Sequence, residues 1–403
     1  MTAPAPDDFD PGTTDSPAAV YAEFDRLRRE APVARTSALG GYWALTRYDD
    51  VRDAAADSRL FISSVKAVVP SDPRGLRRPP LNFDAPRHTP YRRALDRTLQ
   101  RRRLERLEPA LRGHARRELG PLLAAGSGDV ASGFGSIFPA WVTAEWLNLE
   151  PEIAPVLAAT AAEWVDGWRR LDAETVTARS ERMYEIARRL VADRAANPRP
   201  VEEDPASSLL AERDDDGSAL EPDQIVGALR QSLVVGMVAP PILLGAIVLH
   251  LGRDRDLQDR LRADLSLVPA AFEEFVRLYS PYRGFARTVS EPTVLHGRRI
   301  EPGEPVTLAY AAANRDPAVF ERPDEFVLDR PNIAQHLGFG RGRHACVGMP
   351  LARLSLTIAV TELLAATAWF DAEEPPGTGA RMPEVGPTSV LVRVQPASTR
   401  LAS

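Results

Sequence analysis

The sequence HLGFGRGRHACVGMPLAR, residues 336–353, holds Cys346, the single cysteine of the 403-residue chain. Glycines occupy positions 338, 340, 342 and 348, and His344 stands two residues before the cysteine. Because glycine lets the backbone approach another group closely, a thiol among glycines is well placed as a metal or cofactor ligand or as a reactive nucleophile. A buried structural cysteine is the remaining interpretation, because free cysteines are commonly buried.

Composition excludes several classes of protein. A single cysteine rules out a disulfide framework, an all-cysteine zinc site and the two-cysteine attachment of a c-type haem. The formal net charge of -6 gives no support to a nucleic-acid partner. The start, MTAPAPDDFDPGTTDSP, lacks the basic and apolar regions of a signal peptide. No run of about 18 apolar residues free of charge is found, so we expect no membrane span and a cytoplasmic protein.

The chain is predicted to form a flexible N-terminus at 1–16 and a single domain at 17–403, mainly α with a small β-sheet region. A charged connector is expected at 202–221, and a long loop, of a length that is often functional, at 62–86. Predicted helices cover 17–30, 48–57, 88–98, 102–125, 130–147, 152–168, 173–196, 222–251, 254–263, 268–279 and 347–366. Predicted strands cover 33–35, 42–46, 287–289, 293–295, 306–308, 326–328 and 388–394.

A helix beginning directly after Cys346 would direct its unpaired N–H groups and the positive end of its dipole at the sulfur, which stabilises a thiolate. A protease-like Cys–His pair is disfavoured, because His344 is too close in sequence to reach the required geometry easily. A dinucleotide-binding loop is excluded, because Arg343 stands where the last glycine of G-x-G-x-x-G belongs. The small residues at 340, 342 and 348 would let a flat cofactor lie against the backbone.

FGRGRHACVG, residues 339–348, resembles the haem-binding signature of the cytochrome P450 superfamily. The resemblance implies the cytochrome P450 fold, with a haem-ligand loop at 336–350 and haem b (iron protoporphyrin IX) as cofactor. Cys346 would be the thiolate ligand of the iron and the catalytic centre. Phe339 would pack beside the sulfur, and His344 would meet a haem propionate. Gly340 and Gly348 are the implied close contacts with the cofactor.

Other motifs extend the resemblance over essentially the whole chain. Glu274 and Arg277 resemble the family's ExxR pair, which implies a structural lock under the haem. His88 and Arg92 lie one helical turn apart in HTPYRR. Together with Arg287 they resemble the family's propionate contacts, where cations neutralise two buried carboxylates. AAANRDPAVFERPDEFVLDR, residues 311–330, is similar to the family's segment before the cysteine loop.

The chain departs from the family in its long central helix, which normally carries an acid followed by an alcohol that assist proton delivery. Aligned on Gly236, which is implied to lie against the haem, this chain has Val238 at the acid position and Ala239 at the alcohol position. Neither side chain can relay a proton. Pro240 and Pro241 remove two helix N–H groups and are expected to kink the helix over the cofactor.

The resemblance implies a bacterial, soluble haem-thiolate oxidoreductase that uses O2 and external electrons to oxidise a natural product or a small peptide. The missing acid–alcohol pair leaves hydroxylation, oxidative coupling of aromatic rings and direct use of peroxide open. A haem protein that senses gas or carries electrons without oxidising a substrate is the alternative from another class. The apolar distal helix and the long 62–86 loop favour a pocket, and therefore an enzyme.

Residues of the substrate pocket follow from family position only. They are the loop 65–82 and Val234, Val235, Met237, Val238, Ala239, Arg283, Phe285, Ser389 and Val390. Trp164 and Trp168 are candidates for the roof, although aromatic residues at helical spacing are more typical of a core. The implied partners are a ferredoxin and its reductase, with a basic docking face formed by Arg341, Arg343 and residues 101–103.

Overall fold

The computed structural model describes residues 7–11, 16–69, 76–379 and 382–397. The predicted flexible N-terminus falls largely outside these residues, as does part of the 65–82 loop. Within the described part, Asp8 is tied to the strand that follows. Its N–H donates to the Arg35 carbonyl at 2.8 Å, and its carboxylate accepts from the Arg35 N–H at 2.8 Å.

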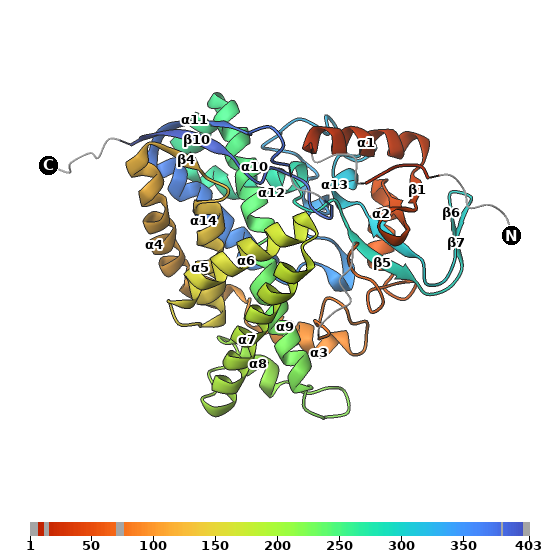
Figure 1. Ribbon diagram of the computed structural model, residues 1–403. Helices are drawn as coiled ribbons and strands as arrows, with labels where there is room; N and C mark the ends of the chain where they lie inside the picture. The colour runs from red at the N-terminus through yellow and green to blue at the C-terminus, as the bar shows by residue number, and fades with distance from the viewer. Residues whose placement is uncertain (1–6, 12–15, 70–75, 380–381, 398–403) are drawn as a thin grey trace.

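Helices form most of the fold, and the longer ones gather on the side away from the N-terminus (Figure 1). They are α1 (Pro17–Glu30), α2 (Tyr48–Ala56), α3 (His88–Arg97), α4 (Arg101–Ala125), α5 (Phe134–Leu147), α6 (Ile153–Arg170), α7 (Ala173–Ala196), α8 (Pro205–Ala211), α9 (Pro222–Val235), α10 (Ala239–Arg253), α11 (Arg255–Ala263), α12 (Val268–Leu278), α13 (Tyr310–Ala313) and α14 (Met349–Ala366). Short 3-10 turns are η1 (Ala38–Gly40), η2 (Leu265–Leu267), η3 (Ile333–Gln335) and η4 (Gly342–His344).

Three small sheets complete the fold. A five-stranded sheet has the order β1-β2-β8-β5-β3, a three-stranded sheet the order β4-β10-β9, and β6 pairs with β7 alone. The strands are β1 (Val33–Thr36), β2 (Tyr42–Leu45), β3 (Phe61–Ile62), β4 (Ser127–Asp129), β5 (Phe285–Val289), β6 (Thr293–Leu295), β7 (Arg298–Ile300), β8 (Pro305–Leu308), β9 (Thr367–Glu373) and β10 (Leu391–Pro396). β2 and β8 run parallel, and the remaining named pairs are antiparallel.

Side-chain caps fix the starts of α7, α8 and α11. The Asp172 carboxylate accepts from the Thr175 N–H at the start of α7, and the Asp204 carboxylate accepts from the Ser207 N–H at the start of α8. Such a cap is worth about 1 kcal/mol. The helix predicted over 173–196 matches α7, whereas α8 lies in the stretch that the sequence indicates as a connector. Seven residues are too few to show a helical period.

Two other predictions are corrected by the structure, and β9 was not predicted. Residues 326–328 form a turn instead of a strand, because the chain there wraps around the buried Glu274 and the Val327 N–H donates to its carboxylate. The last strand begins at Leu391 instead of 388, since residues 388–390 turn toward Asp129. β9 follows α14 directly, so that its start is not marked by any glycine or proline.

The predicted helix 222–251 is two helices, interrupted at 236–238. We call α9 and α10 together the distal helix. The helix is interrupted directly before Pro240 and Pro241 instead of kinked at them, and the two prolines lie in the first turn of α10, a position that tolerates a missing N–H. Gly236 allows the break to pack closely, since a Cβ there would lie 2.5 Å from Oγ1 of Thr143 on α5.

The distal helix, as Pro222–Arg253, and α14 have the length and apolar composition of membrane spans. Most of the apolar stretch of the distal helix is buried inside the fold, and such core helices pass the same test. Their apolar residues join the largest core cluster with α4, α5 and α12. These two helices therefore form the part of the core that supports residues 336–353.

Candidate functional site

The cysteine loop, residues 336–353, is held by close backbone contacts. Gly342 has a φ of 72° and packs on the end of α2, where a Cβ would lie 2.4 Å from the Ala55 carbonyl oxygen. Only glycine meets both requirements. The Cys346 N–H donates to the Phe339 carbonyl at 2.8 Å, which closes the loop around the glycines. Backbone contacts therefore fix the position of Cys346, independently of side-chain interactions.

The Cys346 thiol faces the inside of the protein. Its side chain is exposed, yet burial is the largest influence on the thiol and raises its pKa. Both observations hold when the exposed surface belongs to an interior cavity. Hydrogen bonds from the backbone at Gly348 and Met349, where α14 begins, oppose the effect of burial and favour the thiolate.

Two imidazoles meet beside the cysteine loop, with 4.6 Å between the ring centroids of His88 and His344. Both ring nitrogens of His88 are buried and have no hydrogen-bond partner among the described residues. Nε2 of His344 lies 3.7 Å from Oδ1 of Asp84, too far for a hydrogen bond. Burial, followed by the charges of His344, Arg92 and Arg343, lowers the pKa of His88 to about 3.

Two arginines add positive charge at the same place. Arg287 on β5 is 4% exposed, and its Nη1 donates to the Ala286 carbonyl at 2.8 Å. No carboxylate in the described part of the chain pairs with it. Arg92 pairs with Asp96 at 2.8 Å and donates to the Ala345 carbonyl at 2.5 Å. Buried cations and unpartnered imidazole nitrogens together form a site that fits carboxylates.

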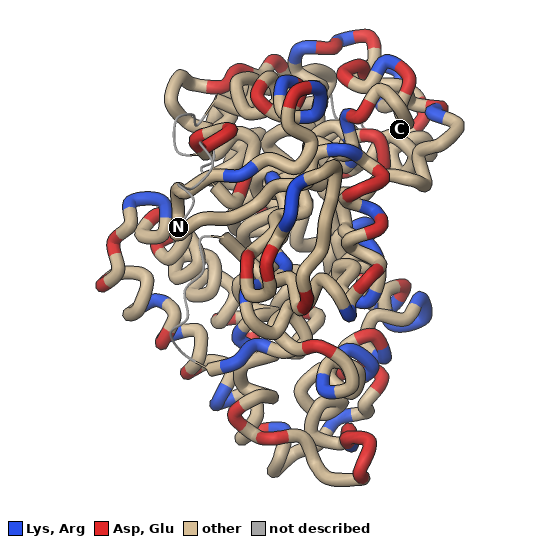
Figure 2. The backbone as a smooth tube through the Cα atoms, turned by 90° about the vertical axis from the view of Figure 1, so that its right-hand side faces the viewer, with Lys and Arg blue, Asp and Glu red and all other residues tan. Residues whose placement is uncertain are grey.

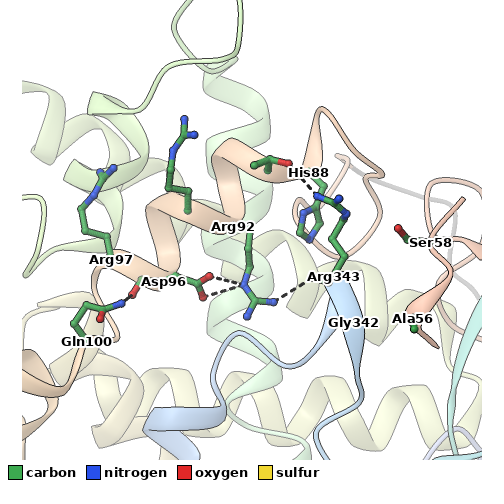
Figure 3. A pocket seen from close by; sticks show the side chains of 11 residues that line it. Ala56, Ser58, His88, Arg92, Asp96, Arg97, Gln100, Gly342 and Arg343 are labelled. Carbon is green, nitrogen blue, oxygen red and sulfur yellow. Dashed lines mark hydrogen bonds and ion pairs between the residues drawn. The ribbon is translucent and has the colours of Figure 1, made fainter. Parts of the chain in front are cut away.

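A groove of about 780 Å³ runs along α3 past this cluster. Figure 3 shows Arg92 reaching between Asp96 and Arg343, with His88 behind it and Arg97 further along the same helix. Arg97 is partly neutralised by Glu212, at 2.7 Å, whereas the exposed Arg343 makes a long contact with Thr89, at 3.4 Å. The groove carries net positive charge, because four arginines and one aspartate line it.

Glu274 and Arg277 on α12 form a fully buried pair, with both side chains 0% exposed and 2.7 Å between the charged atoms. Arg330 adds a second cation at 3.0 Å. Arg277 also donates to the carbonyls of Asn314 and Pro323 at 2.9 and 2.7 Å. The predicted lock is therefore a triad, and Arg330, the last residue of the motif 311–330, is a member that spacing alone does not reveal.

A second group under the loop was not predicted from the sequence. Nε2 of His336 lies 3.0 Å from Glu273, and Nδ1 of His336 accepts from the Gly338 N–H at 3.2 Å. Arg353 on α14 pairs with Glu273 at 2.7 Å. Burial would raise the pKa of Glu273, but the contacts with His336 and Arg353 outweigh it and hold that pKa at about 2. These residues clamp both ends of the loop.

The distal helix presents an apolar wall at its break. Val235 is 43% exposed, and Ala239 is partly exposed. Val234 and Val238 are buried with Val165 of α6 and Met183 of α7, and Trp164 and Tyr282 pack against that cluster. Trp164 stacks on Trp168 with 5.7 Å between centroids. Tyr282 is a wall residue that the sequence does not single out.

Four predicted pocket residues make contacts within the fold, and their place in a substrate pocket stays a prediction. Met237 and Val390 are buried in the main core, and the Val390 N–H donates to Asp129. Ser389 is also hydrogen-bonded to Asp129. Arg283 donates to the carbonyls of Glu384 and Pro11 and lines a separate cavity of about 280 Å³ beside α1. Phe285 does lie next to Tyr282, with 4.8 Å between ring centroids.

Comparison with known proteins identifies the family. Residues 246–400 match the family model described as Cytochrome P450. Cytochrome P450 109 of Bacillus spizizenii is 30% identical over 359 residues, which cover 86% of this chain and 84% of that protein. The chain belongs to the cytochrome P450 family. The monooxygenase PikC of Streptomyces venezuelae is 32% identical over 85% of this P450 and 83% of its own length.

Solved structures agree. CYP109Q5 from Chondromyces apiculatus superposes with a TM-score of 0.84 at 26% identity, covering 95% of this chain and 98% of that one. CYP108D1 from Novosphingobium aromaticivorans gives a TM-score of 0.83 at 27% identity, covering 94% and 97%. The predicted fold class, a mainly α cytochrome P450 fold in one domain, is confirmed. This P450 is an oxidoreductase, and its family is one of haem-thiolate enzymes.

Proposed function

We propose that this P450 binds haem b through Cys346 and oxidises a natural product or a small peptide. The observation that carries the proposal is the accessible thiol of Cys346, in the loop that brings His344 beside the unpartnered imidazole nitrogens of His88 and near the buried cation Arg287. When bound, the haem supplies activation of O2 with electrons from a donor. The protein supplies the ligand, the counter-charges and the walls.

The cysteine loop would supply the ligand of the haem iron. The backbone N–H groups at the start of α14 favour the thiolate form of Cys346, which is the form that binds metal. Gly340 and Gly348 keep the loop free of side chains near the sulfur, and Phe339 packs on the core next to it. Gly236 would bring the distal helix close to the cofactor from the other wall.

His88, His344, Arg92 and Arg287 would hold the two propionates of the haem. The unpartnered nitrogens of the imidazoles would gain hydrogen bonds, and the buried Arg287 guanidinium would gain a counter-ion. A carboxylate placed beside His88 would raise its low pKa, because a nearby negative charge favours the imidazolium. These residues and the haem propionates are chemically complementary, because positive charge and unpartnered imidazole nitrogens would meet an acidic ligand.

Natural products are the proposed substrate class. PikC, the cyclomarin C epoxidase CymV of Salinispora arenicola, 30% identical, and the pulcherriminic acid synthase of Bacillus subtilis, 28% identical, are relatives whose names point to such chemistry. The apolar wall at Val235 and Ala239 suits an apolar or aromatic substrate. Neither Val238 nor Ala239, at the acid and alcohol positions, can relay a proton, so hydroxylation and oxidative coupling both stay within the proposal.

A separate ferredoxin with its reductase is the proposed electron donor, in the cytoplasm. The groove along α3 and the exposed Arg341 and Arg343 form a basic face for an acidic protein. Figure 2 shows Lys and Arg positions spread over the backbone among Asp and Glu positions. Of residues 101–103, Arg101 is 92% exposed, whereas Arg103 is half-buried against the carbonyl of Glu145 and is structural.

The test is the absorption spectrum of the reduced, carbon-monoxide-bound protein. A thiolate-type spectrum in the wild type that is lost in Cys346→Ser would support the ligand assignment, and a wild type without it would refute the assignment. Product masses then separate the reactions: a gain of one oxygen indicates hydroxylation, whereas a loss of two hydrogens indicates coupling or desaturation. Arg341→Glu and Arg343→Glu should slow reduction by ferredoxin, most strongly at low ionic strength.

A further inference from the structure

A second cavity, of about 280 Å³, lies between α1 and the five-stranded sheet (Figure 1). We call it the α1 cavity. Apolar side chains from both elements line it, among them Val20 and Phe24 of α1 and Ala44 of β2. Among the described residues, it shares no lining residue with the groove along α3, and neither Cys346 nor the break at 236–238 lines it. The α1 cavity is therefore distinct from the site at the cysteine loop.

The register of the sheet explains why space remains under α1. Ala44 of β2 is the partner of Ala34 on β1 and of Thr307 on β8. Thr307 is in turn the partner of Ala286 on β5. Because paired residues of neighbouring strands project from the same face of a sheet, these four short side chains form one row. Three alanines and one threonine project too little to fill the space below the helix.

Thr307 supplies the polar group that marks the α1 cavity as a binding site. Its side chain lines the cavity and is only 4% exposed, and Oγ1 has no hydrogen-bond partner among the described residues. Buried hydroxyl groups normally have a partner. Ala44 and Ala286, at the paired positions on either side, carry no group that could supply one. An oxygen atom of a ligand in the cavity would satisfy the Thr307 hydroxyl.

The charged groups around the α1 cavity favour a neutral ligand. The guanidinium of Arg283 lines the cavity, held by two backbone carbonyls, and would repel a cation. Asp10 and Glu23 line it as well, and their carboxylates would repel an anion. The phenol of Tyr42 stays protonated, because burial raises its pKa. A neutral molecule meets no such repulsion.

Volume sets the size of the ligand. An apolar cavity of about 150 Å³ is large enough to bind benzene. The α1 cavity, at about 280 Å³, therefore has room for a molecule of about ten non-hydrogen atoms.

We infer that the α1 cavity binds a small, neutral, mainly apolar molecule through one oxygen atom that forms a hydrogen bond with Oγ1 of Thr307. This ligand is a second molecule, bound in addition to whatever the site at Cys346 accepts. The inference does not depend on the proposed function, because no residue that carries it belongs to the cysteine loop or to the distal helix.

The test uses the ferric, haem-loaded full chain without an electron donor, and 2-naphthol, naphthalene and 2-naphthoate as probes. Calorimetry gives the dissociation constants, and the Soret band reports any binding next to the haem. We expect 2-naphthol to bind most tightly, in one equivalent that leaves the Soret band unchanged, and 2-naphthoate to bind most weakly. Thr307→Val keeps the branched shape and should weaken 2-naphthol binding roughly 3- to 10-fold, with naphthalene binding unchanged.

Ala44→Leu tests the location, because the larger side chain fills the cavity and should abolish this binding of both 2-naphthol and naphthalene. A crystal soaked in 6-bromo-2-naphthol should place the bromine between α1 and β8. If Ala44→Leu does not fold, Thr307→Val and the position of the bromine still decide the question.

Thr288→Val is the matched control. Thr288 lies on the neighbouring strand β5, is 1% exposed and has an Oγ1 without a partner among the described residues, but it does not line the cavity. The variant should bind 2-naphthol as the wild type does. Equal wild-type constants for 2-naphthol and naphthalene, an equal loss in both threonine variants, binding only with a Soret shift, or bromine found only elsewhere would each overturn the inference.

Discussion

The two sides of the cavity at Cys346 are built on opposite principles. Below the cysteine loop, Glu274 is fully buried and accepts from Arg277, Arg330 and the Val327 N–H. On the other side, the break of the distal helix is apolar, and the buried Glu384, which bridges to Tyr282 through its backbone, pairs with Arg169 through its carboxylate. The difference teaches that several charged contacts together fix the position of the ligand. The wall that meets the substrate is not fixed in this way and can vary.

The largest effect is expected from replacing the ligand, Cys346. Cys346→Ser removes the thiolate, and we expect complete loss of the thiolate-type carbon-monoxide spectrum and of activity. The spectrum measures the ligand, and turnover of any accepted substrate measures the consequence. Because the loop is shaped by backbone contacts, the far-ultraviolet circular dichroism should stay unchanged. A variant with a normal spectrum would remove Cys346 from the site.

The next effect is on stability. Glu274→Gln leaves Arg277 and Arg330 buried without their counter-ion, so we expect the free energy of unfolding to fall by about 3–5 kcal/mol. Urea denaturation measures it. The control is Glu105→Gln, whose partner Arg101 is 92% exposed, and it should change stability by no more than about 1 kcal/mol. Equal losses in both variants would contradict an over-determined cysteine side.

A smaller effect depends on pH. The pKa of Glu273 is about 2 in the folded protein, below its value in the unfolded chain, so its ionised form stabilises the fold. That contribution is present above about pH 4.5 and is lost as the pH falls toward 2. Between pH 5 and 3.5 the wild type should lose about 1 kcal/mol more stability than Glu273→Gln. If the free energies of unfolding of the two proteins fell in parallel, the contacts of Glu273 with His336 and Arg353 would contribute no pH-dependent stability.

The smallest effect is expected on the distal side. Burial raises the pKa of Glu384 despite the opposing influence of Arg169 and Arg283. A carboxyl whose folded pKa lies above its unfolded one is costly to ionise in the fold, and the cost appears as the pH rises above the unfolded value. Glu384→Gln should therefore change stability at pH 7 by less than about 1 kcal/mol, in the stabilising direction. A loss as large as that of Glu274→Gln would erase the contrast.

Much of the cysteine side could be predicted because its contacts are local in sequence or carried by charge. The glycines, the helix after Cys346 and the pair at Glu274 and Arg277 all have a fixed spacing. Arg330 and the clamp of His336 with Glu273 could not be predicted, because their partners lie far apart in the chain and meet only through packing. No periodic pattern in the sequence indicates that these residues are in contact.

The distal side was harder to predict for a different reason. Family position places Arg283 and Phe285 near the cavity, and strict strand alternation would put these two residues on one face. The backbone bends at residue 283, between the bridge at Tyr282 and β5, so the rings of Tyr282 and Phe285 meet while Arg283 donates to backbone carbonyls. The side-chain direction depends on the bridge to Glu384, which pairs residues about a hundred positions apart.

The interruption at 236–238 also has a mechanical consequence. Pro240 and Pro241 have no N–H to offer the carbonyls of Gly236 and Met237, so no helical hydrogen bond crosses the joint at these two positions. α9 and α10 are therefore two separately hydrogen-bonded helices, and a change of angle between them at 236–238 would break no helical hydrogen bond at these two positions.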